Sequence, residues 1–264
     1  METADKIPKV IHYVWVGDKE IPEHFRRCID TFKTFHPDWE VKEWNEVGSN
    51  LADHDWVKLA LAERNWALAS DVIRVKVLKE HGGIYMDTDV EVLQPLDKFL
   101  ENSFFIGYEN KLWANTAIIG SVANHPIIVD AWKRYEVPID KIKFNTNLMT
   151  VHNFNAVIKR LYGVKLDGRT RELPDNAKIY AKEYFYPQDY ITYRIRRTEN
   201  SHTIHHYASS WHTGFQKSGI RIGRVFRMIV GAWIWRLFER MARRGLARRL
   251  NKERKRNDRN SGIN

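Results

Sequence analysis

The segment that decides the fold runs from Ala67 to Leu93 and reads ALASDVIRVKVLKEHGGIYMDTDVEVL. Four of its apolar residues recur at helical spacing: Leu68, Val72, Val75 and Leu78. This spacing predicts a helix that packs one apolar stripe against a sheet. The pair Gly82-Gly83 then favours a helix stop, and the apolar residues after it predict a short buried strand.

Two aspartates follow that predicted strand. Asp87 and Asp89 come after Ile84-Tyr85-Met86, and alternation along an extended chain places Tyr85, Asp87 and Asp89 on one face. A buried carboxylate pair is costly unless a cation neutralises it. Mg²⁺ and Mn²⁺ prefer oxygen ligands and often bind one or two carboxylates together with phosphate oxygens. The pair therefore indicates a divalent metal that holds the diphosphate of a sugar nucleotide. A surface turn with two solvated acids is the competing interpretation.

The surrounding chain has an α/β pattern. Residues 6–17 predict a buried strand, residues 23–35 a helix and residues 39–44 a half-buried strand, and this order suggests a Rossmann-like sheet. Further strands are expected in several short stretches: residues 104–108, 117–122, 179–180, 184–186 and the start of 202–212. Residues 109–115 read as a polar-aromatic link, and helices are expected around 125–135 and before Leu161.

Length and composition fit one good-sized domain with an appendage, since the chain has 264 residues and a mass of 31.3 kDa. A single cysteine, Cys28, leaves no internal disulfide and fits a reducing compartment. The first ten residues lack the apolar core of a signal peptide, and no run reaches the roughly 18 apolar residues of a membrane span. We therefore expect a cytoplasmic protein, peripheral on the inner face of the membrane.

The basic charge is concentrated at the C-terminal end. Residues 217–264 carry 15 Lys and Arg against three acidic residues, so residues 1–216 hold a net charge of −2 although the whole chain is +10. We predict a catalytic domain over 1–216 and a basic amphipathic helical tail over 217–264. The tail contains the stretch Arg221–Phe238, whose short apolar centre between arginines is typical of a helix lying on an anionic membrane surface.

Three blocks of sequence resemble a known enzyme family. They are Ile7–Gly17 (IPKVIHYVWVG), Ala69–Asp89 and His206–Trp211. Together they resemble the DXD-containing sugar transferases of glycosyltransferase family 32, which include initiating α-1,6-mannosyltransferases and capsular polysaccharide enzymes. The likeness extends, more distantly, to the catalytic domains of the large clostridial glucosylating toxins. It covers about residues 6–215 and excludes the basic tail.

This resemblance implies a GT-A fold and a retaining hexosyltransferase. The expected donor is a UDP-hexose or GDP-mannose, the expected metal is Mn²⁺ or Mg²⁺, and the expected acceptor is a glycan, lipid-linked, in surface polysaccharide synthesis. No carboxylate nucleophile for a double displacement is identifiable in the sequence. A same-face attack, in which the leaving phosphate takes the acceptor's proton, is the preferred hypothesis for retention.

The resemblance also assigns donor contacts, at Trp15, Ser70, Asp71, Arg74, Tyr85, Asp87, Asn115, Ser209 and Trp211. Trp15 would stack on the base, Asp71 would accept hydrogen bonds from hydroxyls, and Arg74 would offer its planar fork to phosphate or sugar oxygens. The alternative interpretation of Trp15 is an ordinary core tryptophan, and that of Asn115 is a turn asparagine.

The resemblance assigns catalysis to Asp87, Asp89 and Arg74. It assigns metal binding to Asp89, Asp87 and His206. His206 stands where the toxins have a carboxylate, so a hydrogen-bonded structural histidine is the competing interpretation for it.

Three other classes of protein fit the sequence less well. A phosphatase of the haloacid-dehalogenase type also places D-x-D after an apolar strand, but no later paired acidic motif follows Leu93. A nucleic-acid-binding protein would fit the basic tail, although the body of the chain is slightly acidic. A catalytically dead transferase scaffold is disfavoured because the expected donor residues are present.

Overall fold

The structure is a computed structural model of the chain and describes residues 6–138, 150–190 and 192–208. The chain divides into two compact units, which are Met1–Gln188 with Ile195–Trp211, and Asp189–Arg194 with His212–Asn264. Every helix and strand described below lies in the first unit. The predicted boundary at 216/217 and the predicted tail helix lie outside the described residues and stay predictions.

A mixed sheet forms the centre of the first unit. Seven strands of the described chain make it, in the order β2-β1-β3-β6-β5-β8-β7. Its first half contains β1 (Val10–Val14), β2 (Glu40–Trp44) and β3 (Gly83–Met86), with α1 (Glu23–Phe35), α2 (Asp55–Ala62) and α3 (Trp66–His81) in the connections. Because β1 runs parallel to both β2 and β3, the predicted Rossmann-like opening is confirmed.

The second half of the sheet breaks this parallel pattern. It contains β5 (Phe104–Asn110), β6 (Trp113–Ser121), β7 (Arg171–Leu173) and β8 (Ala177–Tyr180). β6 is antiparallel to β3 and to β5. A separate antiparallel pair joins β4 (Val90–Val92) to β9 (Thr203–His205). The remaining elements are η1 (Asp97–Phe99), α4 (Pro126–Trp132), α5 (Thr150–Tyr162) and α6 (Lys182–Phe185). The expected α/β class is thus confirmed as a mixed α/β fold.

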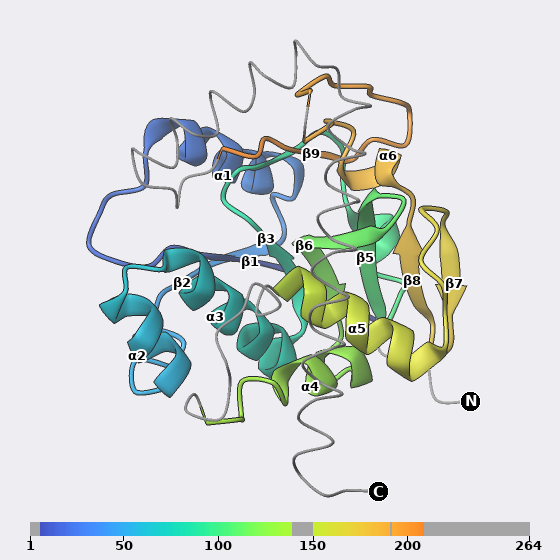
Figure 1. The fold of residues 1–264 in the computed structure, drawn as a ribbon. Coiled ribbons are helices and arrows are strands. Elements are labelled where there is room, and N and C mark those ends of the chain that lie inside the picture. Colours follow the sequence, from blue (N-terminus) through green and yellow to red (C-terminus); the bar gives the residue numbers. More distant parts are fainter. Residues whose placement is uncertain (1–5, 139–149, 191, 209–264) are drawn as a thin grey trace, which may run out of the picture. The chain divides into compact units, whose positions relative to one another are not determined.

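Helices and the small β4–β9 sheet cover the two faces of the main sheet (Figure 1). One apolar cluster lies under α2, α3, α4 and α5, and the other lies under α1, the β4–β9 pair, η1 and α6. The strands feed both clusters by alternation. Phe104 and Ile106 belong to the first cluster, whereas Phe105 between them belongs to the second. Among the described helices, none combines the length and apolarity needed to cross a membrane.

A glycine pair sets the path from α3 into β3. Gly82 has a φ of 64° and its N–H donates to Leu78 O at 3.0 Å, which ends the helix. At Gly83, a Cβ atom would lie 2.5 Å from the Val10 side chain, so only glycine lets β3 approach β1 so closely. His12 donates from Nε2 to Gly82 O at 2.9 Å, and burial lowers the pKa of His12 to about 4. The start of the strand that leads to the aspartates is therefore held firmly.

Two local predictions were wrong. The expected link 109–115 is mostly strand, because β5 continues to Asn110 and β6 begins at Trp113. The Asn155 amide donates to Ala114 O and accepts from Ala114 N–H, and this tertiary contact from α5 holds β6 in place. Residues 184–186 were expected as strand, but Lys182–Phe185 form α6. Their aromatic pattern reflects burial of Phe185 in the second cluster.

Candidate functional site

The two aspartates lie on a tight turn between β3 and β4. The strand ends at Met86, one residue before Asp87, so the extended run expected through Asp89 is wrong. The Asp87 N–H donates to Ala117 O at 2.8 Å, and Val90 N–H donates back to Asp87 O at 3.0 Å. The turn nevertheless directs both carboxylates to the same place.

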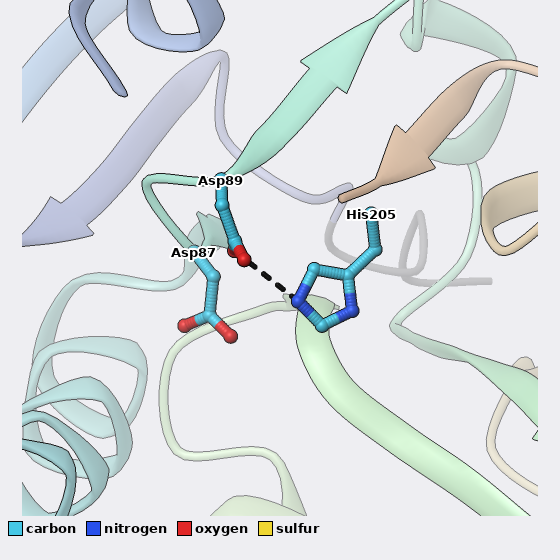
Figure 2. A group of neighbouring side chains, drawn as sticks. All are labelled: Asp87, Asp89 and His205. Carbon is cyan, nitrogen blue, oxygen red and sulfur yellow. Dashed lines mark ion pairs between the residues drawn. The ribbon is translucent and has the colours of Figure 1, made fainter. Parts of the chain in front are cut away.

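His205 joins the two aspartates, as Figure 2 shows. Because Val90 pairs with His205 in the β4–β9 sheet, the imidazole lies beside the turn. His205 Nε2 is 3.2 Å from Asp89 Oδ1. One potential ligand atom from each of Asp87, Asp89 and His205 lies within 4.8 Å of the others.

Helix α3 supplies the other half of the site. The Arg74 guanidinium is buried and lies 3.1 Å from both Asp71 Oδ1 and Asp87 Oδ1. It also donates to Thr116 O at 2.9 Å. Tyr85 donates to Asp87 Oδ1 at 2.8 Å, and its hydroxyl is 3.1 Å from Ser70 Oγ. The structure thus brings together five residues predicted to contact the donor: Ser70, Asp71, Arg74, Tyr85 and Asp87.

The two carboxylates differ in protonation behaviour. Burial raises the pKa of Asp87, and the attraction of Arg74 only partly offsets this. For Asp89 burial acts in the same direction, but His205 and the Ala208 N–H together lower its pKa. Burial acts to lower the pKa of His205, yet its net shift is upward because of Asp89. A site that holds one imidazole and two close carboxylates favours a cation between them.

The donor set fits a divalent metal. Two carboxylates and one imidazole provide oxygen and nitrogen ligands of the kind that Mn²⁺ accepts, and open positions remain for phosphate oxygens. The other imidazole nitrogen of His205, Nδ1, is buried without a hydrogen-bond partner in the part of the chain that the structure describes. Residues present at the site therefore match the metal that the sequence predicted.

His206 has a different position from its neighbour. Its Nε2 is 2.9 Å from Glu91 Oε2, and its N–H donates to Asp89 O at 3.0 Å. The structure therefore places the His206 ring on Glu91, while His205, which the sequence analysis did not select, lies with the aspartates. The two adjacent histidines could be recognised in the sequence as candidate metal ligands. Only the β4–β9 register shows which of them lies beside the aspartates. Ser209 and Trp211 lie outside the described residues.

Trp15 contacts Phe25, a residue that lines a cavity adjoining Asp89. Its indole Nε1 donates to Lys19 O at 2.6 Å, and its ring centroid is 5.7 Å from that of Phe25. Phe25 lines a cavity of about 440 Å³. The cavity reaches from α1 to the aspartate turn and is lined by His24, Phe25, Arg27, Cys28, Thr31, Asp89, Glu91, His206 and Ala208.

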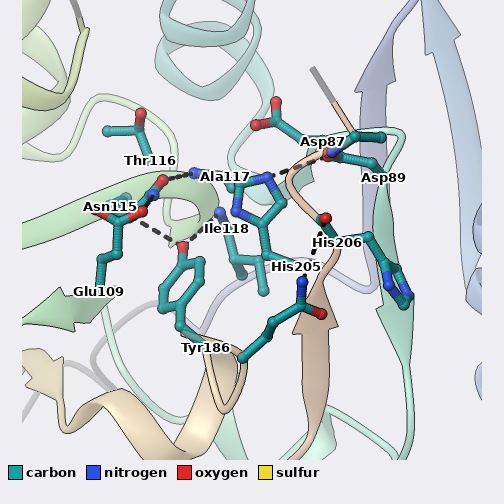
Figure 3. A network of polar contacts seen from close by, with 12 residues as sticks. Asp87, Asp89, Glu109, Asn115, Thr116, Ala117, Ile118, Tyr186, His205 and His206 are labelled. Carbon is teal, nitrogen blue, oxygen red and sulfur yellow. Dashed lines mark hydrogen bonds and ion pairs between the residues drawn. The ribbon is translucent and has the colours of Figure 1, made fainter. Parts of the chain in front are cut away.

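Asn115 lies on β6, on the far side of His205 from the aspartates (Figure 3). Its Nδ2 donates to Glu109 Oε1 at 2.9 Å, and its Oδ1 accepts from Ala117 N–H at 2.8 Å. Tyr186 donates to the Asn115 carbonyl at 3.1 Å. Asn115 is therefore a fixed strand residue beside the site and not a turn residue. Glu109 was not predicted, because it was assigned to a link.

Comparison with known proteins agrees with this site. Residues 22–106 match the family described as a glycosyltransferase sugar-binding region containing the DXD motif. They contain the helix α3, the strand β3 and both aspartates of the turn. The match therefore confirms, for this region, the resemblance to DXD-containing sugar transferases that the sequence predicted.

Two similar curated proteins come from yeasts. Inositol phosphoceramide mannosyltransferase 1 of Schizosaccharomyces pombe is 28% identical over 141 residues, which is 48% of this chain and 42% of that protein. Mannosyl phosphorylinositol ceramide synthase CSH1 of Saccharomyces cerevisiae is 26% identical over 223 residues, 79% of this chain and 54% of that protein. The chain thus spans about half the length of these relatives.

Similar solved structures include two glycosyltransferases. The PaToxG glycosyltransferase aligns with a TM-score of 0.47 at 21% identity and covers 60% of this chain and 70% of its own. The galactosyltransferase LgtC in complex with donor and acceptor sugar analogues aligns with a TM-score of 0.40 at 12% identity, over 81% of this chain and 93% of its own.

Proposed function

We propose that this protein is a metal-dependent GT-A glycosyltransferase that moves a hexose from a nucleotide-diphosphate sugar to a glycan acceptor. The observation that supports it best is the convergence of Asp87, Asp89 and His205 within 4.8 Å of one another, beside the buried Arg74. A partly buried cluster of this kind is suited to binding the negatively charged diphosphate of a donor together with a divalent cation.

Each side of the site has its own task in this proposal. Asp89, Asp87 and His205 would hold Mn²⁺ or Mg²⁺, which when bound supplies positive charge for the departing diphosphate. Arg74 fixes the Asp87 carboxylate from the side of α3. Asp71, which accepts from Thr150 N–H at 3.3 Å, would also accept hydrogen bonds from donor hydroxyls. Trp15, whose ring contacts that of the cavity-lining Phe25, would stack on the nucleotide base.

The acceptor is the second part of the proposal. Two relatives carry inositol phosphoceramide or phosphorylinositol ceramide in their names. A glycan or polyol carried by a lipid is therefore the acceptor class that we propose here, in keeping with the surface-polysaccharide role expected from the sequence. Transfer would retain the anomeric configuration through attack on the face that the diphosphate leaves.

A donor-hydrolysis screen tests the transferase proposal. With Mn²⁺ present, the purified protein is expected to release the sugar from one of a panel of UDP- and GDP-sugars, because water can replace the acceptor. EDTA should suppress this release, and added Mn²⁺ should restore it. Product anomers are then read by NMR with an acceptor panel. Release that is insensitive to EDTA would contradict the metal site, and an inverted linkage would contradict retention.

The basic tail is the basis for proposing that the protein binds an anionic membrane surface. Residues 217–264 hold a net charge of +12, and each Lys or Arg near an anionic leaflet contributes on the order of 1 kcal/mol of binding. Vesicles that contain roughly 30% phosphatidylserine serve as the anionic probe. When they are sedimented, removal of residues 220–264 is expected to move the protein from the pellet to the supernatant. Vesicles of neutral lipid are the control. Unchanged partitioning after truncation would exclude the tail as an anchor.

A further inference from the structure

The second nitrogen of His205 is an unexplained feature of the site. Nε2 faces Asp89 at 3.2 Å, but Nδ1 is buried with no hydrogen-bond partner among the residues described. A buried polar atom without a partner is costly, so each such atom requires a physical explanation. If Nε2 binds a metal, Nδ1 must carry the proton and becomes a donor. Metal-binding histidines almost always donate this N–H to a carboxylate, a carbonyl or a water.

The His205 ring cannot easily turn to find another partner. The Tyr207 ring lies against it with centroids 4.1 Å apart, and the Tyr186 ring approaches edge-on at 6.0 Å. The side chain is 11% exposed. Its orientation is thus set by packing, and Nδ1 needs a partner at the position that it already occupies.

Glu109 is the nearby carboxylate with no assigned task. Its Oε1 accepts from Asn115 Nδ2 at 2.9 Å, which fixes the carboxylate on β5. Burial raises the pKa of Glu109, and the attraction of His205 acts against this shift, so the two groups interact electrostatically. In Figure 3 the His205 ring lies between the aspartates on one side and the Asn115–Glu109 pair on the other.

We infer that Glu109 is a positioning residue for His205. The Nδ1–H group donates to one bridging water, which in turn donates to the Glu109 carboxylate. The proton thus stays on Nδ1, and the Nε2 lone pair is kept directed toward a cation bound by Asp87 and Asp89. A bridging water accounts for the lack of a direct bond, since such waters are nearly as favourable as direct contacts between polar groups. The inference rests on the proposed metal-dependent function and extends it to a residue outside the ligand set.

Mn²⁺ affinity measured by EPR tests the inference without any substrate. Glu109→Gln, which preserves shape and the contact with Asn115, is expected to weaken Mn²⁺ binding about 10–100-fold. In a His205→Ala background the same change is expected to alter the affinity less than about 2-fold, because the relay is already absent. Glu101→Gln is the matched control, since Glu101 forms an exposed pair with Lys6 at 2.8 Å.

Imidazole ¹⁵N NMR of the protein saturated with Mg²⁺, which is diamagnetic, provides a second measurement. Wild type should show His205 with its proton on Nδ1, and Glu109→Gln should reduce that population. Equal Mn²⁺ losses with and without His205, or an unchanged tautomer and affinity, would overturn the inference while the metal site stands. Failure of the wild-type protein to bind Mn²⁺ would overturn both this inference and the proposed metal dependence.

Discussion

The Asp89→Ala variant is expected to lose about 10³-fold in the rate of sugar transfer, which corresponds to about 4 kcal/mol. Asp89 is the carboxylate that keeps its charge most readily at this site, because His205 and the Ala208 N–H lower its pKa against the effect of burial. Without it, the remaining pair of Asp87 and His205 offers one carboxylate fewer to the cation, so Mn²⁺ binding should weaken as well. Steady-state kinetics and EPR titration measure the two effects separately.

Structural damage must be separated from this chemical effect. Asp89 Oδ2 also accepts from Ala208 N–H at 2.8 Å, so Asp89→Asn is the companion variant, with the same shape and an oxygen still able to accept. Asp53→Ala is the matched control, because Asp53 has a side chain 99% exposed and pairs only with the exposed Lys58 among the salt bridges described. If folded Asp89→Ala protein transfers sugar at the wild-type rate, the central proposal is wrong.

Local spacing was sufficient to predict much of this site. Asp71 and Arg74 are neighbours because residues three apart share a helix face, and their ion pair is present at 3.1 Å. The helix stop at Gly82 and the start of the strand after it were likewise visible in a local signal, the Gly82-Gly83 pair. These features were accessible because each depends on a few consecutive positions, whose geometry the periodicity of a helix or strand fixes.

Features set by distant contacts could not be predicted in the same way. His205 is the last residue of β9 and His206 follows it, and their rings contact different partners, Asp89 and Glu91. Which of them meets the aspartates depends on the pairing of β9 with β4, more than 100 residues earlier in the chain. Glu109 could not be predicted as a site residue for a similar reason. Its strand pairs with β6, and β6 is held by the hydrogen bonds of Asn155, on α5, to Ala114. Neither the β4–β9 pairing nor the Asn155–Ala114 contact can be predicted from the periodicity of a single segment.

Arg74→Met is expected to lower the free energy of unfolding by about 3–5 kcal/mol, because it leaves buried carboxylates without their counter-charge. The guanidinium is 7% exposed and lies 3.1 Å from both Asp71 and Asp87. Methionine fills similar space but supplies no charge and no donor for Thr116 O. Urea unfolding followed by circular dichroism measures the loss. Lys58→Met is the control, since an exposed ion pair contributes about 0–1 kcal/mol.

The pH dependence of this loss identifies Asp87 as its source. Burial already raises the pKa of Asp87 above its ordinary value, and removal of Arg74 should raise it further. A carboxyl group whose pKa is higher in the folded state favours folding at low pH, and this advantage disappears as the pH rises through the folded-state pKa. The Arg74→Met defect should therefore be larger at neutral than at acidic pH. Adding Asp87→Asn should recover part of the stability at neutral pH, since the two residues are in contact and their effects do not add. A defect of equal size at both pH values, with no recovery in the double variant, would show that packing and not charge makes Arg74 necessary.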